Sequence, residues 1–297
     1  MSTPSPRIGL ATCSEVPDLD DEGRLLAEAL RAAGATATPL VWDDAALDDA
    51  AWASYDLVVV RSTWDYAERL DEFLAWVDRV AALTRLENPP ALLRWSTDKR
   101  YLADLAAAGV PTVPSAFVAP DEAHASVEHP YLDVEHVVKP SVGAGSRGAL
   151  RFGADEADRS RAHVAALTAD GFTALVQPYL SEVDEAGETG VVAIDGEISH
   201  AFRKGALLTV GDELVEGLFK QEEITAREPT PLEVEVARRA LAAVPGGSAA
   251  PLYARVDLLP TPDGPLLLEL ELCEPSFFLD TAPDRAAAIA AAFLRRV

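Results

Sequence analysis

Residues 1–95 alternate between apolar runs and one amphipathic segment. The runs at 7–13 (RIGLATC), 35–42 (ATATPLVW) and 55–60 (YDLVVV) predict strands, and the continuous LVVV is typical of a buried parallel strand. After the first run, an acidic start, apolar residues at helical spacing and a glycine stop predict a helix whose stripe is Leu25, Leu26, Ala29, Leu30 and Ala33. Strands that alternate with a helix predict an α/β unit.

The next two hundred or so residues predict shorter elements, because proline and glycine interrupt them often. LENPP at 86–90 breaks the first pattern and places a domain boundary near residue 95. The helix that follows would take Ser96 or Thr97 as its N-cap. The expected elements are helices over 96–109, 155–169, 231–244 and 283–297, strands over 136–140 and 173–180, and a hairpin over 189–204 turning at Asp195-Gly196. The polar segment 205–223 has no clear period and is interpreted as a mobile cover.

Residues 251–280 (PLYARVDLLPTPDGPLLLELELCEPSFFLD) predict two strands joined by a proline- and glycine-containing turn. Because side chains alternate between the faces of a strand, one face of the first strand carries Tyr253, Arg255 and Asp257. The return strand places Glu269 and Glu271 together, opposite Leu268, Leu270 and Leu272. If the two polar faces coincide, three carboxylates and one guanidinium share a cleft.

Three neighbouring carboxylates repel one another and favour a counterion. Magnesium, bound by carboxylate oxygens and completed by phosphate oxygens, is the natural candidate, with Asp257, Glu269 and Glu271 as ligands. The alternative is an edge hairpin with a solvated acidic face.

Charge and composition narrow the classes of partner. The net charge of −24 argues against duplex DNA and anionic membrane, because both require a basic surface. No run has the apolar length of a membrane span, and MSTPSPRIGL lacks the blocks of a signal peptide, so a soluble cytoplasmic protein is expected. Two cysteines in 297 residues indicate neither a disulfide framework nor a CxxC metal site.

Cationic residues stand out against this acidic background. Lys139 ends the strand HVVKP, and the loop SVGAGSRG (141–148) follows at once, with Ser146 and Arg147 in it. Backbone N–H groups of such a loop are able to surround a phosphate. It is not a P-loop, because ALRF continues as a strand rather than a helix, so a simple hairpin turn is the alternative. Lys99, in the first turn of its expected helix, also indicates a nearby anion.

The apolar run at 55–60 is followed by six residues with dense chemistry: Arg61, Ser62, Thr63, Trp64, Asp65 and Tyr66. They lie at the carboxyl end of a strand, where open α/β sheets bind ligands, and are candidates for substrate binding. The structural alternative has Trp64 and Tyr66 packed over a helix and Arg61 paired with Asp65.

In this order and spacing, the motifs resemble the ATP-grasp superfamily of carboxylate–amine ligases. The resemblance implies an α/β fold of the α+β ATP-grasp type. An N-terminal α/β pre-ATP-grasp domain (1–95) would precede a central subdomain with the glycine-rich flap (96–178) and a C-terminal subdomain with the metal site (179–297), the last two clamping ATP.

The same resemblance implies roles for individual residues. Lys99 and Lys139 would contact phosphates beside the flap, the segment from Gln177 through Tyr179 to Leu180 would hold adenine, and Glu188 would hold the ribose. Arg255-Val-Asp257 and Glu269-Leu-Glu271 resemble the metal signature, with Glu271 where asparagine is common. Two Mg²⁺ ions are expected, with Arg255 as the cation that stabilises the transferred group and Arg203 as a second candidate.

Within the superfamily, RSTWDY, DGEISHAFRKG and the motif from Glu269 to Ser276 resemble the small cyclo-ligases that close O-ureidoserine to cycloserine in antibiotic biosynthesis, and more distantly glutathione synthetase. The implied reaction activates a small, amino acid-like carboxylate as an acyl phosphate and forms an amide bond, within one molecule in the cyclo-ligase case. The alternatives are a nucleotide-binding protein without ligase activity and a phosphotransferase of similar fold. The expected partner is a small-molecule substrate, and a homodimer is the usual prior.

Overall fold

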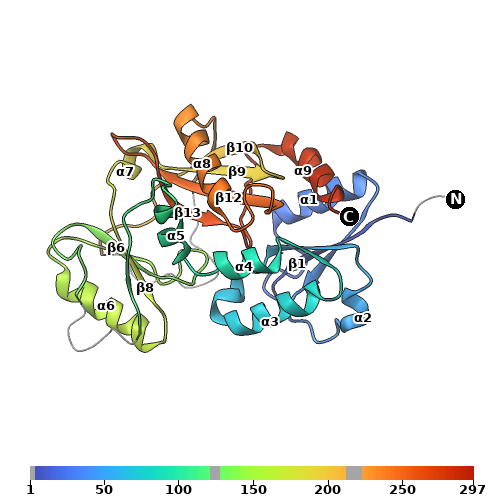
Figure 1. Ribbon diagram of the computed structural model, residues 1–297, viewed down its shortest axis with the longest axis horizontal. Coiled ribbons are helices and arrows are strands. Elements are labelled where there is room, and N and C mark those ends of the chain that lie inside the picture. The colour runs from blue at the N-terminus through green and yellow to red at the C-terminus, as the bar shows by residue number, and fades with distance from the viewer. Residues whose placement is uncertain (1–3, 121–127, 212–222) are drawn as a thin grey trace.

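The computed structural model describes residues 4–120, 128–211 and 223–297 (Figure 1). Three β-sheets organise this part of the chain. No helix in these ranges is both long and apolar enough to cross a bilayer. Residues 212–222 of the expected cover over 205–223 lie outside the described residues.

The first sheet is parallel, with strand order β2-β1-β3-β4. One face packs against α1 together with the C-terminal helix α9, and the other against α2 and α3. The elements are β1 (Arg7–Thr12), α1 (Asp21–Ala32), β2 (Thr36–Val41), α2 (Asp49–Trp52), β3 (Leu57–Ser62), the 3₁₀ helix η1 (Trp64–Glu68), α3 (Leu70–Ala81) and β4 (Arg85–Glu87). The expected α/β unit is confirmed.

Helix α1 begins where its sequence indicates. Asp20 caps it by accepting a hydrogen bond from the Gly23 N–H. Two acidic residues occupy the first turn, where their negative charge interacts favourably with the positive end of the helix dipole. Leu26 and Leu30 are buried as expected, but Leu25 is 39 % exposed. The buried stripe is therefore narrower than the sequence pattern predicts.

The expected helix over 96–109 is confirmed only in its second half, as α5 (Tyr101–Ala107). Its expected start is wrong, because Ser96 ends a separate short helix, α4 (Pro90–Ser96). Pro90 begins α4 because proline fits the first helical turn, and the Ser96 and Thr97 hydroxyls donate back to carbonyls of that helix instead of capping the next one. Lys99 consequently lies in the turn between the two helices.

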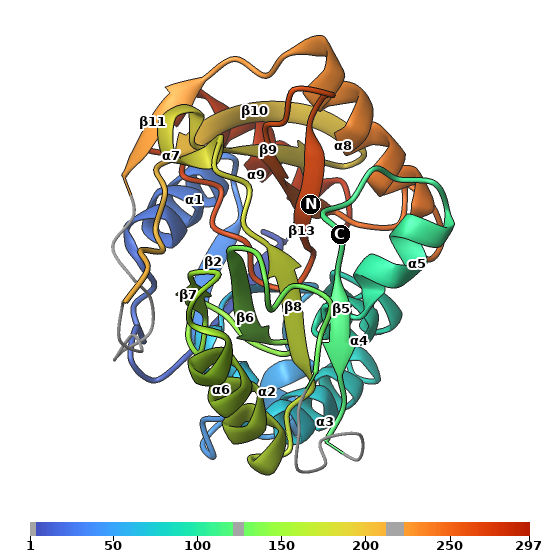
Figure 2. The same ribbon diagram turned by 90° about the vertical axis from the view of Figure 1, so that its left-hand side faces the viewer.

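The second sheet is antiparallel, with strand order β5-β8-β6-β7. Helix α6 covers one of its faces (Figure 2). Its elements are β5 (Ala116–Val118), β6 (His136–Pro140), β7 (Leu150–Phe152), α6 (Ala157–Ala169) and β8 (Ala174–Pro178). The glycine-rich loop joins β6 to β7, so the predicted hairpin is confirmed.

The third sheet is antiparallel, with strand order β11-β10-β9-β12-β13, and α8 packs on one face. Its elements are α7 (Val183–Ala186), β9 (Glu188–Ile194), β10 (Glu197–Lys204), β11 (Ile224–Arg227), α8 (Pro231–Ala243), β12 (Tyr253–Leu259) and β13 (Leu266–Glu271). The turn between β9 and β10 has positive φ at Asp195 (54°) and Gly196 (84°), as the sequence predicts. Thr230 and Glu233 form a capping box at the start of α8.

The hairpin of β12 and β13 has the predicted polar face. Arg255 is directly opposite Glu271, and Asp257 is opposite Glu269. A β-bulge next to Asp257 shifts the register, so that Leu267 enters the core and Leu268 lines a cavity. The expectation that Leu268 faces the core is corrected by this extra residue.

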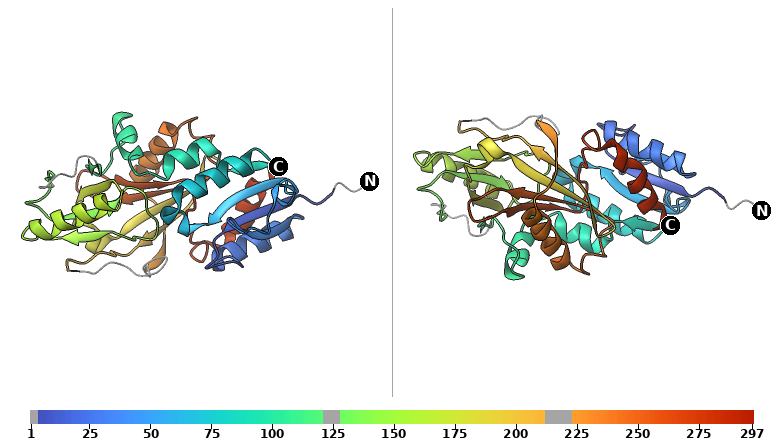
Figure 3. Two further views of the ribbon diagram at one scale, coloured as in Figure 1. Left: turned by 90° about the horizontal axis from the view of Figure 1, so that it is seen from below. Right: turned by 90° about the horizontal axis from the view of Figure 1, so that it is seen from above.

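The C-terminal helix packs against the first helix of the chain. After the 3₁₀ helix η2 (Pro283–Arg285), α9 (Ala286–Leu294) lies beside α1 (Figure 3). Ile289 and Phe293 share one buried cluster with Leu26 and Leu30. The last helix therefore stabilises the first sheet.

Candidate functional site

A cavity of about 760 Å³ lies between the three sheets. Residues from β12 and β13 form one wall, the loop after β6 and the end of β8 form another, and α1 and η1 close the third. Ligand sites commonly form where several units meet in this way. The cavity therefore brings together segments that are far apart in the sequence.

Asp257 is the most buried carboxylate on the strand wall. It accepts hydrogen bonds from Arg255 Nε and Nη2, both at 2.8 Å, and from Lys204 Nζ at 3.2 Å. Burial alone would raise the pKa of Asp257, but these two cations outweigh it and hold the pKa at about 2. Asp257 is therefore ionised at neutral pH.

Glu269 faces two lysines that come from different parts of the chain. Lys99 Nζ lies 3.1 Å and Lys139 Nζ 3.8 Å from its carboxylate oxygens. Burial raises the pKa of Glu269, yet the two lysines lower it below its ordinary value. Burial lowers the pKa of Lys139, since its charge is also removed from water. These three groups join the strand wall to the glycine-rich loop.

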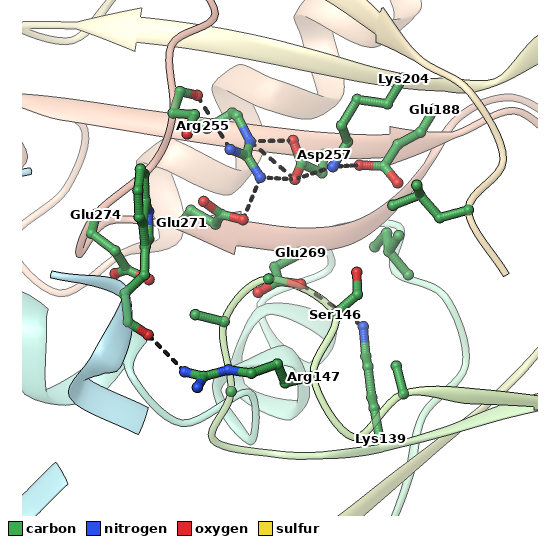
Figure 4. Close-up of a pocket in the computed structure, with 18 of the residues that line it drawn as sticks. Lys139, Ser146, Arg147, Glu188, Lys204, Arg255, Asp257, Glu269, Glu271 and Glu274 are labelled. Atoms are coloured by element: carbon green, nitrogen blue, oxygen red, sulfur yellow. Dashed lines mark hydrogen bonds and ion pairs between the residues drawn. The ribbon is translucent and has the colours of Figure 1, made fainter. Parts of the chain in front are cut away.

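Glu271 contacts Arg255, and Glu188 contacts Lys204. Burial raises the pKa of Glu271 to about 8 and that of Glu188 to about 7, because each has only partial compensation from its cation. Figure 4 shows the resulting row of charges, from Glu188 and Lys204 across Asp257 and Arg255 to Glu271 and beyond.

The carboxylates fit magnesium by their chemistry. Asp257 and Glu269 oppose each other across the strand pair, and carboxylate oxygens are the donors that Mg²⁺ prefers. In the described ranges no three metal-ligating side chains converge on one point. Oxygens of a bound phosphate would therefore be needed to complete the coordination.

The glycine-rich loop bends back over the cavity. The Lys99 ammonium donates to the Gly143 carbonyl at 2.7 Å. Ser146 lines the cavity, and its backbone has a positive φ of 61°. Gly148 has φ 73°, and a Cβ there would lie 2.9 Å from Pro140 Cδ, so glycine is required. Arg147 reaches across to the N-terminal unit, where it contacts Glu68 and donates to the Trp64 carbonyl at 2.8 Å.

The segment 177–180 also lines the cavity. Gln177 is buried and donates to Ser115 Oγ at 3.0 Å. The Arg151 guanidinium lies 3.3 Å from the centroid of the Tyr179 ring. The Tyr179 N–H already donates to the Glu135 carbonyl at 2.8 Å, so this group of the segment is engaged within the protein.

The segment 61–66 divides between cavity and core. Trp64 and Tyr66 line the cavity. Thr63 is fully buried, and the other three side chains bind within the N-terminal unit: Arg61 donates to Glu22, Ser62 to Asp20, and Asp65 accepts from Trp42 and Arg69. Substrate contact by Arg61, Ser62, Thr63 or Asp65 is therefore not supported. In the structural alternative the Arg61–Asp65 pair is wrong, whereas Tyr66 packs against Phe73 of α3 as expected.

Arg203 does not face the cavity. Its guanidinium donates to the Ala186 and Glu185 carbonyls, and the next residue of β10, Lys204, points inward. Neighbouring strand residues face opposite sides, so Lys204 and not Arg203 lines the cavity, and the expected role of Arg203 is not supported. Glu274 also lines the cavity, but it was not among the site residues expected from the sequence, although it stands in the motif from Glu269 to Ser276.

Comparisons with known proteins agree on the relatives of this chain. Residues 8–88 match a family model described as the N-terminal domain of D-cycloserine synthetase DcsG. The chain is 42 % identical over 283 residues to the cycloserine biosynthesis protein DcsG of Streptomyces lavendulae, covering 92 % of both chains. It also superposes on a crystal structure of D-cycloserine synthetase DcsG with a TM-score of 0.85 at 38 % identity, covering 98 % of this chain and 100 % of the other.

More distant structures share the fold. The ATP-grasp ligase PsnB superposes with a TM-score of 0.63 at 21 % identity, covering 99 % of this chain and 100 % of that one. D-alanine–D-alanine ligase from Bacillus anthracis, solved with ATP, gives 0.66 at 15 % identity, covering 98 % of this chain and 97 % of that one. The expected ATP-grasp fold is therefore confirmed.

Proposed function

Because this chain belongs to the D-cycloserine synthetase family of ATP-grasp ligases, we propose that it closes a cycloserine-type ring by joining a carboxylate to a nitrogen of the same molecule. As a member of this family it is an ATP-dependent, ADP-forming carbon–nitrogen ligase. The intramolecular reaction and its substrate are the part that we propose.

The ring closure rests on the relatives, and one observation of the structure supports its ATP-dependent step: Lys99 and Lys139 both meet the strand carboxylate Glu269, and Lys99 also donates to the Gly143 carbonyl of the glycine-rich loop. A nucleotide tail of several negative charges requires such cations, and its metal requires such a carboxylate. Lys99, Lys139 and Glu269 come from the turn after α4, from β6 and from β13. They are far apart in the sequence, so it is the tertiary fold that brings their side chains together.

The reaction needs activation because a carboxylate has no good leaving group. Transfer of the γ-phosphoryl group from ATP to a carboxylate oxygen gives an acyl phosphate and ADP. A substrate nitrogen then attacks the carbonyl carbon, the C–O bond to phosphate breaks, and the nitrogen loses its proton. Phosphate leaves, and an amide bond remains.

The residues have distinct parts in this reaction. Lys99 and Lys139 neutralise phosphate oxygens, and Arg255 stabilises charge on the group in transfer. Asp257, Glu269 and Glu271 would hold Mg²⁺, and we propose two ions, which supply charge neutralisation between the two anions. Gln177, Tyr179 and Leu180 would hold the adenine, and Glu188 would bind the ribose; all four line the cavity.

The substrate would bind at the end of the row of charges away from Glu188, and Trp64 and Tyr66 also line this cavity. Aromatic side chains there would exclude water from the acyl phosphate, which water hydrolyses.

We also propose a cytoplasmic homodimer, because the reaction consumes ATP and dimers are the commonest closed assembly. Light scattering would measure the mass.

The test is ADP release from Mg-ATP with O-ureidoserine, in both enantiomers, together with detection of the cyclic product. Hydroxylamine should trap the acyl phosphate as a hydroxamate. ADP release without a hydroxamate would favour a phosphotransferase, and nucleotide binding without ADP release from any acid would favour a binding protein.

A further inference from the structure

Glu274 differs from every other charged group that we describe on the strand wall. The carboxylates of that wall that have a lysine or arginine as ion-pair partner are Glu188, Asp257, Glu269 and Glu271. Glu274 lines the same cavity and is 8 % exposed, and within the described ranges it has no ion-pair partner. It lies at the end of the row of charges, beyond Glu271 (Figure 4).

The groups around Glu274 do not compensate its charge. The Cys273 thiol donates to its carboxylate, and Tyr66 is a neutral neighbour. Lys99 and Arg255 act to lower the pKa of Glu274, but their ion pairs are with Glu269, Asp257 and Glu271. A buried carboxylate without a close cation is costly, and burial accordingly raises the pKa of Glu274 to about 7.

The backbone on both sides of Glu274 is held firmly in place. Asn88 donates to the Leu272 carbonyl at 2.7 Å, and the Tyr253 hydroxyl donates to the Cys273 carbonyl at 3.0 Å. Further along, Glu22 accepts from the backbone N–H of Phe277 at 2.9 Å. Buried contacts of this kind fix a side chain before a ligand arrives, which is the usual property of a binding group.

On the basis of the proposed ligase function, we propose that Glu274 binds an ammonium group of the substrate and so selects amino acids over the same acids without an amino group. The reacting carboxylate must lie near Arg255 and the metal-binding carboxylates. Glu274 borders that place, on the side away from the nucleotide end. An amino acid carries its ammonium one carbon from its carboxylate, so both groups would meet complementary charge.

A metal ion is the other cation that a carboxylate attracts. Magnesium requires several oxygen donors, and Glu274 lies on the loop after β13, outside the strand pair that carries Asp257 and Glu269. Of the groups around Glu274, the Cys273 thiol and the Tyr66 phenol are poor magnesium ligands, and the Glu271 carboxylate already contacts Arg255. An ammonium needs only one charged partner, which is what the site offers.

The experiment compares two acids and three variants. O-ureidoserine carries the ammonium, and 3-(ureidooxy)propanoic acid is the same molecule without it. Glu274→Gln removes the charge at constant shape, and Glu274→Asp keeps it. Asp284→Asn is the matched control, since it removes one negative charge from an exposed side chain outside the cavity.

We expect the wild type to prefer O-ureidoserine by about 10²-fold in kcat/KM, because a desolvated charge pair discriminates by about this factor. Glu274→Gln should lose the preference, mainly through KM for O-ureidoserine, with little change for the acid without an amino group. Glu274→Asp should keep part of the preference, and Asp284→Asn all of it. Equal use of both acids by the wild type, or an equal loss with both acids in Glu274→Gln, would overturn the proposal.

Two further readouts separate the possible failures. A raised Mg²⁺ activation constant in Glu274→Gln, with the preference intact, would make Glu274 a metal ligand and overturn the proposal. Thermal stabilisation by each acid with Mg-ADP tests the preference without turnover. If the wild type releases no ADP yet is stabilised only by O-ureidoserine, and Glu274→Gln is not, the proposed ring closure fails while the ammonium site stands.

Discussion

Replacement of Arg255 by alanine tests the proposed site most directly. Arg255 is 6 % exposed, donates to Asp257 at 2.8 Å, contacts Glu271 and donates to the Ser276 carbonyl at 3.2 Å. Loss of one partner from a buried ion pair costs about 3–5 kcal/mol of folding stability. Asp257 keeps Lys204 at 3.2 Å, and Glu271, with its pKa raised to about 8, is largely protonated at pH 7, so little uncompensated charge remains and we expect a loss at the lower end.

The effect on catalysis should be separate from the effect on stability. Removal of one donor that stabilises charge in the transition state costs about 3 kcal/mol, which corresponds to about 10²-fold in turnover. ATP binding should survive, because Lys99 and Lys139 are unchanged. The assay is therefore ADP release with saturating acid, at a temperature well below the melting point of the variant, alongside the ATP dissociation constant.

Arg203→Ala is the matched control. It removes the same guanidinium from the same sheet, but on the side away from the cavity. Turnover of Arg203→Ala should stay near that of the wild type. Wild-type turnover in Arg255→Ala, or an equal fall in both variants, would refute the role that we assign to Arg255.

Three other predictions follow from the charged groups. Glu269→Gln should raise the Mg²⁺ concentration needed for half-maximal ADP release, and an unchanged value would contradict its role. Mg-ATP should protect the bond after Arg147 from trypsin, and equal cutting with and without nucleotide would exclude a closing loop. Burial raises the pKa of Glu274 from 4.5 to about 7 in the folded protein, so its ionisation lowers stability as pH rises between these values. In urea titrations, Glu274→Gln should gain up to about 3 kcal/mol over wild type at pH 8 and nothing at pH 4.

Local patterns in the sequence were sufficient for the strand wall of the cavity. Arg255, Asp257, Glu269 and Glu271 share a face because side chains alternate along a strand, and this alternation needs no knowledge of the rest of the chain. The α/β unit and the loop between β6 and β7 followed from the same kind of pattern. Even here, the bulge beside Asp257 moved Leu268 to the cavity side, since bulges depend on the partner strand.

The choice between Arg203 and Lys204 could not be made locally. Both are basic and adjacent in β10, and a register shift between Ile198 and His200 alters which residues face the cavity. Arg61 was misassigned for a similar reason. Its partner Glu22 lies in α1, and the ring that its guanidinium contacts, Phe277, comes from the far end of the chain.

The sequence by itself determined which chemical groups this protein has and, for each hairpin, which of them lie side by side. Those relations span a few residues and follow from strand geometry. Only the tertiary structure decided that Lys99 and Lys139 meet at Glu269, that α9 stabilises the first sheet, and that Glu274 has no ion-pair partner in the part of the chain that the structure describes. Each of these depends on packing between distant segments. For the charged groups the physical reason is that burial, neighbouring charges and hydrogen bonds together set the pKa of a buried side chain.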